Sequence, residues 1–74
     1  MKLNDKDKVY VCHSNRPNRE ATIISEGIYD LTGEEVWWVK MEDHFPIAFL
    51  KLPENGKFYN VGNRTYWIKP LVKI

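Results

Sequence analysis

The chain has 74 residues and a mass of 8.8 kDa, which is enough for one small domain and too little for a multidomain enzyme. Its hydrophobic share of 43% and its charged share of 28% are ordinary for a folded chain and exclude a disordered one. The net charge of +1 argues against a strongly basic nucleic-acid binder.

The first half of the chain contains short runs of β-branched and aromatic residues, which predict strands. A first strand is predicted over residues 9–13, and a polar loop that Pro17 interrupts is predicted over residues 14–19. The second strand is expected over residues 20–29. Gly27 lies inside it and predicts a bulge or a sharp bend.

The middle of the chain holds the clearest strand, over residues 35–42, after a turn predicted at residues 30–33. Alternation gives this strand an apolar face with Trp37, Val39 and Met41. Its other face is mixed and carries Val36, Trp38, Lys40 and Glu42. We expect Trp37 to lie in the core together with Phe49.

The second half is punctuated by turn residues. Residues 47–52 form either a strand or a short helix, because six residues do not distinguish the two. An Asn-Gly pair within residues 53–56 predicts a tight hairpin, and a further turn is predicted at residues 61–64. The last clear strand is expected over residues 65–68, before Pro70. Residues 71–74 add a short closing edge.

Five or six strands in about 65 residues favour a small curled barrel that closes its own edges. The layout has an entry strand, a polar loop, a long bent strand, a tight turn, a Trp-bearing strand and a late strand ending in Ile68-Lys69-Pro70-Leu71. This order resembles the SH3-like small barrels, which include Tudor and KOW modules. The resemblance is one of layout over residues 8–71, so it implies a fold and transfers no binding residue.

We therefore expect one domain over residues 1–74, with a polar N-terminal lead-in at residues 1–7. The single cysteine, Cys12, excludes an internal disulfide. No window approaches the roughly 18 apolar residues that a membrane span needs. We expect a cytoplasmic protein without membrane association.

Residues suited to catalysis or metal binding are few and scattered. Cys12 and His13 are neighbours on a predicted strand, so their side chains point to opposite faces and do not meet. The two histidines and the cysteine lack metal-ligand spacing. The carboxylate pairs at residues 34–35 and 42–43 are consecutive, which is typical of solvated turns. We expect no catalytic residue, no metal and no cofactor.

The charges are distributed unevenly. Residues 20–43 hold seven acidic residues and one basic residue, whereas residues 55–74 hold four basic residues and no acidic one. The simpler interpretation is that the two segments pair across strands and neutralise each other. The alternative is a bipolar surface that favours head-to-tail association or an oriented partner.

Aromatic residues make up 14% of the chain, which is more ring volume than we expect so small an interior to enclose. Exposed Trp, Tyr and Arg side chains are the usual anchors of binding surfaces. The alternative is that these rings lie at the barrel rim with only their polar tips in water. The predicted binding residues are Trp38, Lys57, Tyr59, Arg64, Tyr66, Trp67 and Lys69.

These observations favour a non-enzymatic binding module with a protein partner, which includes a second copy of the chain. In size the chain is similar to small accessory and inhibitor proteins, including those of phages and mobile elements. The alternative is single-stranded nucleic acid along the basic and aromatic residues of the C-terminal segment. A small-molecule pocket between identical chains is neither supported nor excluded.

Overall fold

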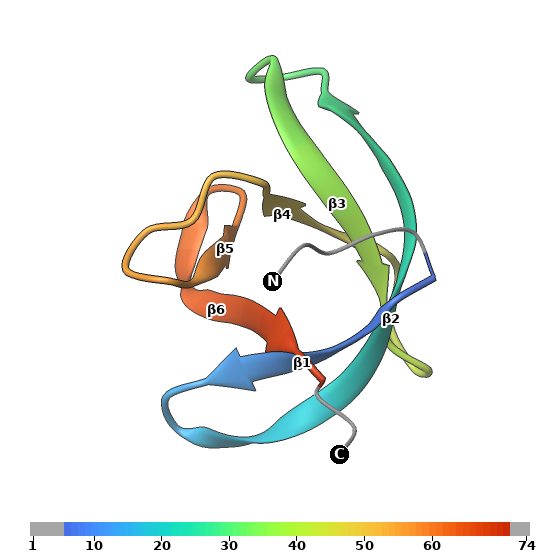
Figure 1. The fold of residues 1–74 in the computed structure, drawn as a ribbon, viewed down its shortest axis with the longest axis vertical. Coiled ribbons are helices and arrows are strands. Elements are labelled where there is room, and N and C mark those ends of the chain that lie inside the picture. Colours follow the sequence, from blue (N-terminus) through green and yellow to red (C-terminus); the bar gives the residue numbers. More distant parts are fainter. Residues whose placement is uncertain (1–5, 72–74) are drawn as a thin grey trace.

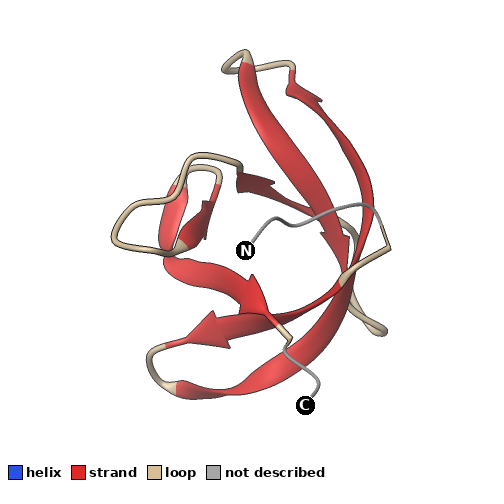
Figure 2. Ribbon diagram, viewed as in Figure 1, coloured by secondary structure: helices blue, strands red, loops and turns tan. Residues whose placement is uncertain are grey.

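The computed structural model describes residues 6–71, whose six antiparallel strands form a closed barrel (Figure 1). The strands are β1 (Lys8–His13), β2 (Arg16–Tyr29), β3 (Glu34–Lys40), β4 (Ile47–Leu50), β5 (Phe58–Asn60) and β6 (Asn63–Pro70). Each strand pairs with the next, and β6 pairs with β1. Figure 2 shows strands and loops but no helix in this part of the chain, which confirms the predicted all-β barrel.

The described residues contain no helix long and apolar enough to span a membrane.

The core lies inside the barrel and is built by alternate residues of the strands. Phe49 and Ile68 have no exposed surface, and Trp37 is 6% exposed, which confirms the prediction for Trp37 and Phe49. The edge of the Trp37 ring meets Phe58 at a centroid distance of 4.7 Å. The Trp37 indole N–H donates a hydrogen bond of 3.2 Å to Glu26, so burying this ring leaves no donor unpaired.

Two tight turns form where the sequence predicts them. Asn55 and Gly56 both have positive φ, at 53° and 77°. The backbone groups of Glu54 and Lys57 exchange two hydrogen bonds of 2.9 Å across this turn. This is the geometry that an Asn-Gly pair favours in a hairpin. The turn after β2 ends with Gly33, whose φ is 73°.

The prediction of a polar loop over residues 14–19 is wrong, because only Ser14 and Asn15 form the turn and β2 begins at Arg16. The pairing of β1 with β2 is irregular between Val11 and His13, where β2 carries one extra residue. Pro17 lies in this irregular stretch. A proline without an N–H is tolerated at such a bulge, so it does not end the strand.

The bulge predicted at Gly27 lies instead at Ile24, where the pairing of β2 with β3 shifts between Ile23 and Ser25. Gly27 pairs regularly with Val36. Backbone bonds also converge beside the bulge: the Ile23 N–H donates to Asp7, and the Lys6 N–H donates to Ile23. The described part of the predicted lead-in, Lys6 and Asp7, is therefore hydrogen-bonded to β2 although β1 begins at Lys8, and residues 1–5 lie outside the described residues.

The remaining boundaries also differ from the predictions. Residues 47–50 form a strand, which settles the choice between strand and helix. The last strand is longer than predicted and extends to Pro70. The Leu71 N–H donates to Lys8, whereas the rest of the predicted closing edge lies outside the described residues. Val36, assigned to the mixed face, has no exposed surface.

The acidic and basic segments do not pair with each other. β2 and β3 carry most of the acidic segment, and β5 and β6 carry most of the described basic one. In the barrel, β1 separates β2 from β6, and β4 separates β3 from β5. The two segments therefore do not neutralise each other across neighbouring strands, and the simpler interpretation of the charge pattern is wrong.

Candidate functional site

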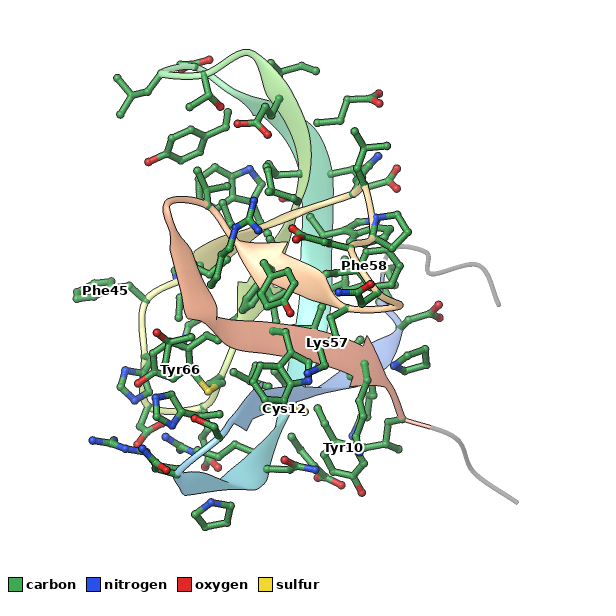
Figure 3. All side chains as sticks on the ribbon, turned by 90° about the vertical axis from the view of Figure 1, so that its left-hand side faces the viewer. Tyr10, Cys12, Phe45, Lys57, Phe58 and Tyr66 are labelled. Carbon is green, nitrogen blue, oxygen red and sulfur yellow. The ribbon has the colours of Figure 1, made fainter. Side chains whose placement is uncertain are left out.

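The outward side of β1, β5 and β6 gathers rings and lysines into one surface. In β6 the side chains alternate: Tyr66 and Ile68 pack with the core, whereas Trp67 and Lys69 point outward. Figure 3 views the barrel from this side and labels Tyr10, Cys12 and Lys57 on it. We call this surface the aromatic–basic stripe; it consists of Tyr10, Lys57, Tyr59, Trp67 and Lys69.

The lysines of the stripe lie over its rings. Lys57 Nζ is 4.2 Å from the centroid of the Trp67 ring, and Lys69 Nζ is 5.7 Å from that of Tyr10. The Tyr59 ring meets Trp67 edge-on at a centroid distance of 6.5 Å. Such cation–π contacts hold the ammonium groups in place at about 0.5–1 kcal/mol each when exposed. The stripe therefore combines positive charge with half-buried rings.

Cys12 lies beneath the stripe, opposite Trp67 in the pairing of β1 with β6. It is 2% exposed. Burial raises the pKa of its thiol above the ordinary value of 9.0, and the charges of Lys69 and Lys57 offset part of this increase. A buried thiol with a raised pKa is a poor nucleophile, so this arrangement gives no support to thiol catalysis.

His13 points to the opposite side of β1 from Cys12, as the sequence predicts. Its ring lies against Tyr66, with the centroids 4.7 Å apart. Its Nδ1 accepts a hydrogen bond of 3.0 Å from the Asn15 N–H. Among residues 6–71, no group of three or more His, Cys, Asp or Glu side chains is placed to hold a metal ion.

The structure brings together four of the seven predicted binding residues and separates the other three. Trp38 lies on β3, where its ring is 6.1 Å from that of Tyr29. Arg64 forms an ion pair of 2.7 Å with Glu54. Tyr66 faces inward and packs against the core. These three side chains are not part of the stripe.

Sequence reasoning missed Tyr10 as a member of the stripe. The signal that was available is its spacing of two from Cys12, which puts both side chains on the outward face of β1. The pairing of Tyr10 with Lys69 joins residues 59 positions apart in the chain. No local pattern reveals such a contact.

The chain matches no protein-family model, no curated protein and no solved structure.

Proposed function

We propose that this chain is a non-enzymatic binding module whose aromatic–basic stripe binds an acidic segment of a protein partner. The observation that carries the proposal is the outward Trp67 ring, flanked by Tyr59 and covered by Lys57. Trp and Tyr are the residue types that dominate binding energy at protein interfaces. The lysines would attract carboxylates, and the rings would supply apolar contact area.

A protein partner fits the stripe better than single-stranded nucleic acid. Lys57 Nζ lies over one face of Trp67, so a stacking base would have to displace it, whereas a carboxylate could pair with the ammonium group where it lies. The net charge of +1 also offers little attraction to a phosphate backbone. Nucleic acid remains the competing hypothesis, since rings and cations alternate along the same surface.

A second copy of the chain is one partner with the required chemistry. No acidic residue belongs to the stripe: Glu20 of β2 pairs with Tyr10 at its edge, and the other acidic residues of β2 and β3 lie on strands that do not pair with β5 or β6. The acidic side of one copy would therefore complement the stripe of another in a head-to-tail arrangement. Light scattering at two protein concentrations distinguishes this partner from a different protein.

The proposal includes an SH3-like layout for the barrel and a cytoplasmic location. The long strand β2, the tight turn after it and the Trp-bearing strand β3 support this layout, and the closed six-stranded barrel is compatible with it. The unpaired, buried Cys12 suits a reducing compartment.

The test uses fluorescence anisotropy with two labelled probes: a Glu-rich peptide that contains Leu and Phe, and an oligothymidylate. We expect the peptide to bind the wild type, and Trp67→Ala to weaken that binding roughly thirtyfold, the loss typical of an aromatic anchor. Arg64→Gln is the matched control, because Arg64 is also on β6 but outside the stripe. It should leave peptide affinity unchanged.

Two outcomes would overturn the proposal. If the wild type and Trp67→Ala bind the peptide with equal affinity, the stripe is not the binding surface. Tighter binding of the oligothymidylate, with a steep loss between about 50 and 200 mM salt, would establish the nucleic-acid hypothesis instead.

A further inference from the structure

A cavity of about 360 Å³ opens at one end of the barrel, beside the segment that connects β3 to β4. Its apolar lining comes from Val11, Met41 and Ile47, and from the inward face of Tyr66. Val11 and Met41 are buried, so they form a fixed floor. The volume falls within the range of about 300–1,000 Å³ that is typical of small-molecule sites.

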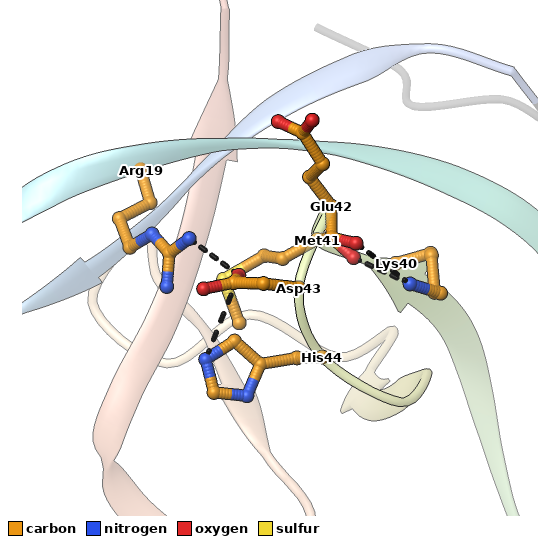
Figure 4. A network of polar contacts seen from close by, with 6 residues as sticks. All are labelled: Arg19, Lys40, Met41, Glu42, Asp43 and His44. Carbon is orange, nitrogen blue, oxygen red and sulfur yellow. Dashed lines mark hydrogen bonds and ion pairs between the residues drawn. The ribbon is translucent and has the colours of Figure 1, made fainter.

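The rim of this cavity carries two guanidinium groups and two imidazole rings. Arg16, Arg19, His13 and His44 all line it, and no carboxylate does among the described residues. Arg19 donates a hydrogen bond to Asp43, whose Oδ1 is also 3.7 Å from His44 Nε2 (Figure 4). The bond from Arg19 holds the pKa of the Asp43 carboxyl below its ordinary value, so Asp43 stays charged and keeps Arg19 occupied.

Arg16 differs from Arg19, because it forms no ion pair within residues 6–71. Its guanidinium therefore retains a full set of donors for an incoming anion. A guanidinium fork binds a carboxylate through two parallel hydrogen bonds, which adds both affinity and orientation.

The polar groups around the cavity are already oriented. His13 Nδ1 accepts the Asn15 N–H, which leaves Nε2 as the donor of the neutral ring. A tilted contact with the Tyr66 ring, at a centroid distance of 4.7 Å, restricts the orientation of the same ring. Lys40 Nζ donates to the Met41 carbonyl at 2.7 Å and thereby ties down the segment that forms one wall (Figure 4). Binding here would require little reordering.

We propose that this cavity binds a small organic acid, with its carboxylate on Arg16 and His13 and its apolar body against Met41 and Ile47. The cationic rim selects the charge of the ligand, and the apolar floor excludes a bare inorganic anion as the best occupant. The site is separate from the aromatic–basic stripe, because Tyr66 and Trp67 are consecutive residues that face opposite sides of β6.

The test is a titration of the ¹⁵N-labelled protein with 4-phenylbutyrate, followed by NMR, with 4-phenylbutyramide as the uncharged analogue and acetate as the carboxylate alone. We expect 4-phenylbutyrate to shift the amide signals of Val11, Met41 and Ile47. The amide and acetate should each bind about tenfold more weakly, because each lacks one of the two contacts.

Arg16→Gln is the informative variant, because Arg16 is exposed and its loss leaves the core intact. It should weaken the binding of 4-phenylbutyrate about tenfold and leave the affinity for 4-phenylbutyramide unchanged. Lys57→Gln removes the same charge from the stripe and should change neither ligand. Ile47→Phe, which fills the cavity, should weaken both.

The proposal is overturned if the acid and the amide bind equally, if Arg16→Gln has no effect, or if the shifts cluster on the stripe. The proposal is also overturned if the signal shifts do not saturate by about 20 mM 4-phenylbutyrate, since that limit corresponds to negligible affinity. None of these results bears on the peptide assay with Trp67→Ala, so the two proposals fail separately.

Discussion

The two faces of β6 bury apolar groups by different means. On the inner face, Ile68 is fully buried because the other strands close around it. On the outer face, Trp67 is only half-buried, and its cover consists of the long side chain of Lys57 and the edge of Tyr59. The packed inner face cannot rearrange without unfolding, whereas the flexible Lys57 side chain can move away from the Trp67 ring. Side chains of a partner can therefore replace Lys57 over this ring.

The largest effect that separates the two faces is on stability. Phe49→Ala should lower the free energy of unfolding by about 3–5 kcal/mol, because it empties a fully buried site. Trp67→Ala should cost no more than about 2 kcal/mol, since that ring keeps part of its contact with water. Urea denaturation measures both changes. Leu52→Ala, at a residue that is 83% exposed, is the control and should stay within about 0.5 kcal/mol of the wild type.

If Trp67→Ala proved as costly as Phe49→Ala, the ring would be a structural element rather than an exchangeable surface. The contrast between the two faces of β6 would then be wrong.

A smaller effect distinguishes two glycines, one on a strand and one in a turn. A Cβ at Gly27 would lie 3.7 Å from Trp38 Nε1, an ordinary contact on the outer face of β2 and β3. Gly27→Ala should therefore be neutral or stabilise the fold by up to about 1 kcal/mol. Gly56→Ala should destabilise it by about 1 kcal/mol or more, because φ there is +77°. Melting temperatures of the two variants should move in opposite directions or at least differ clearly. A destabilised Gly27→Ala would show that the contact with Trp38 is tighter than this geometry implies.

The smallest effect concerns the thiol beneath the stripe. Burial raises the pKa of Cys12 above 9.0, so its contribution to stability is fully present below pH 9 and is lost as the pH rises through the raised value. Relative to Cys12→Ala, the wild type should lose stability in that alkaline window and match the variant's pH profile below it. Urea midpoints at a series of pH values measure the difference. Parallel profiles throughout would contradict the burial of this thiol.

The same burial predicts that native Cys12 reacts slowly with iodoacetamide at neutral pH. Trp67→Ala should accelerate the reaction if the ring contributes to the cover, which mass spectrometry can follow.

Local sequence was sufficient for the elements whose geometry depends on adjacent residues. The hairpin at Asn55 and Gly56 forms as predicted, because positive φ at two consecutive residues is a local preference. Alternation placed Trp37, Val39 and Met41 on one buried face. The same reasoning failed for residues 14–19, where the polar composition indicated a loop. Pairing with β1 extends β2 through this segment, and composition carries no information about such pairing.

The candidate site was predictable only in part, for a related reason. Alternation places Trp67 and Lys69 on one face and Tyr66 on the other, although all three are among the predicted binding residues. The charge pattern was visible as two segments, but whether they meet depends on strand order. In a closed barrel that order puts a strand between them on each side.

Spacing along the chain thus specified the strands, the turns and the side of each strand that a residue occupies. Barrel closure specified which strands are neighbours, and with them the contact of Lys69 with Tyr10 and the gathering of Arg16, His13 and His44 around one cavity. The physical reason is that backbone sterics and side-chain alternation act over a few residues. Strand register and closure arise from burying the apolar faces of all six strands together.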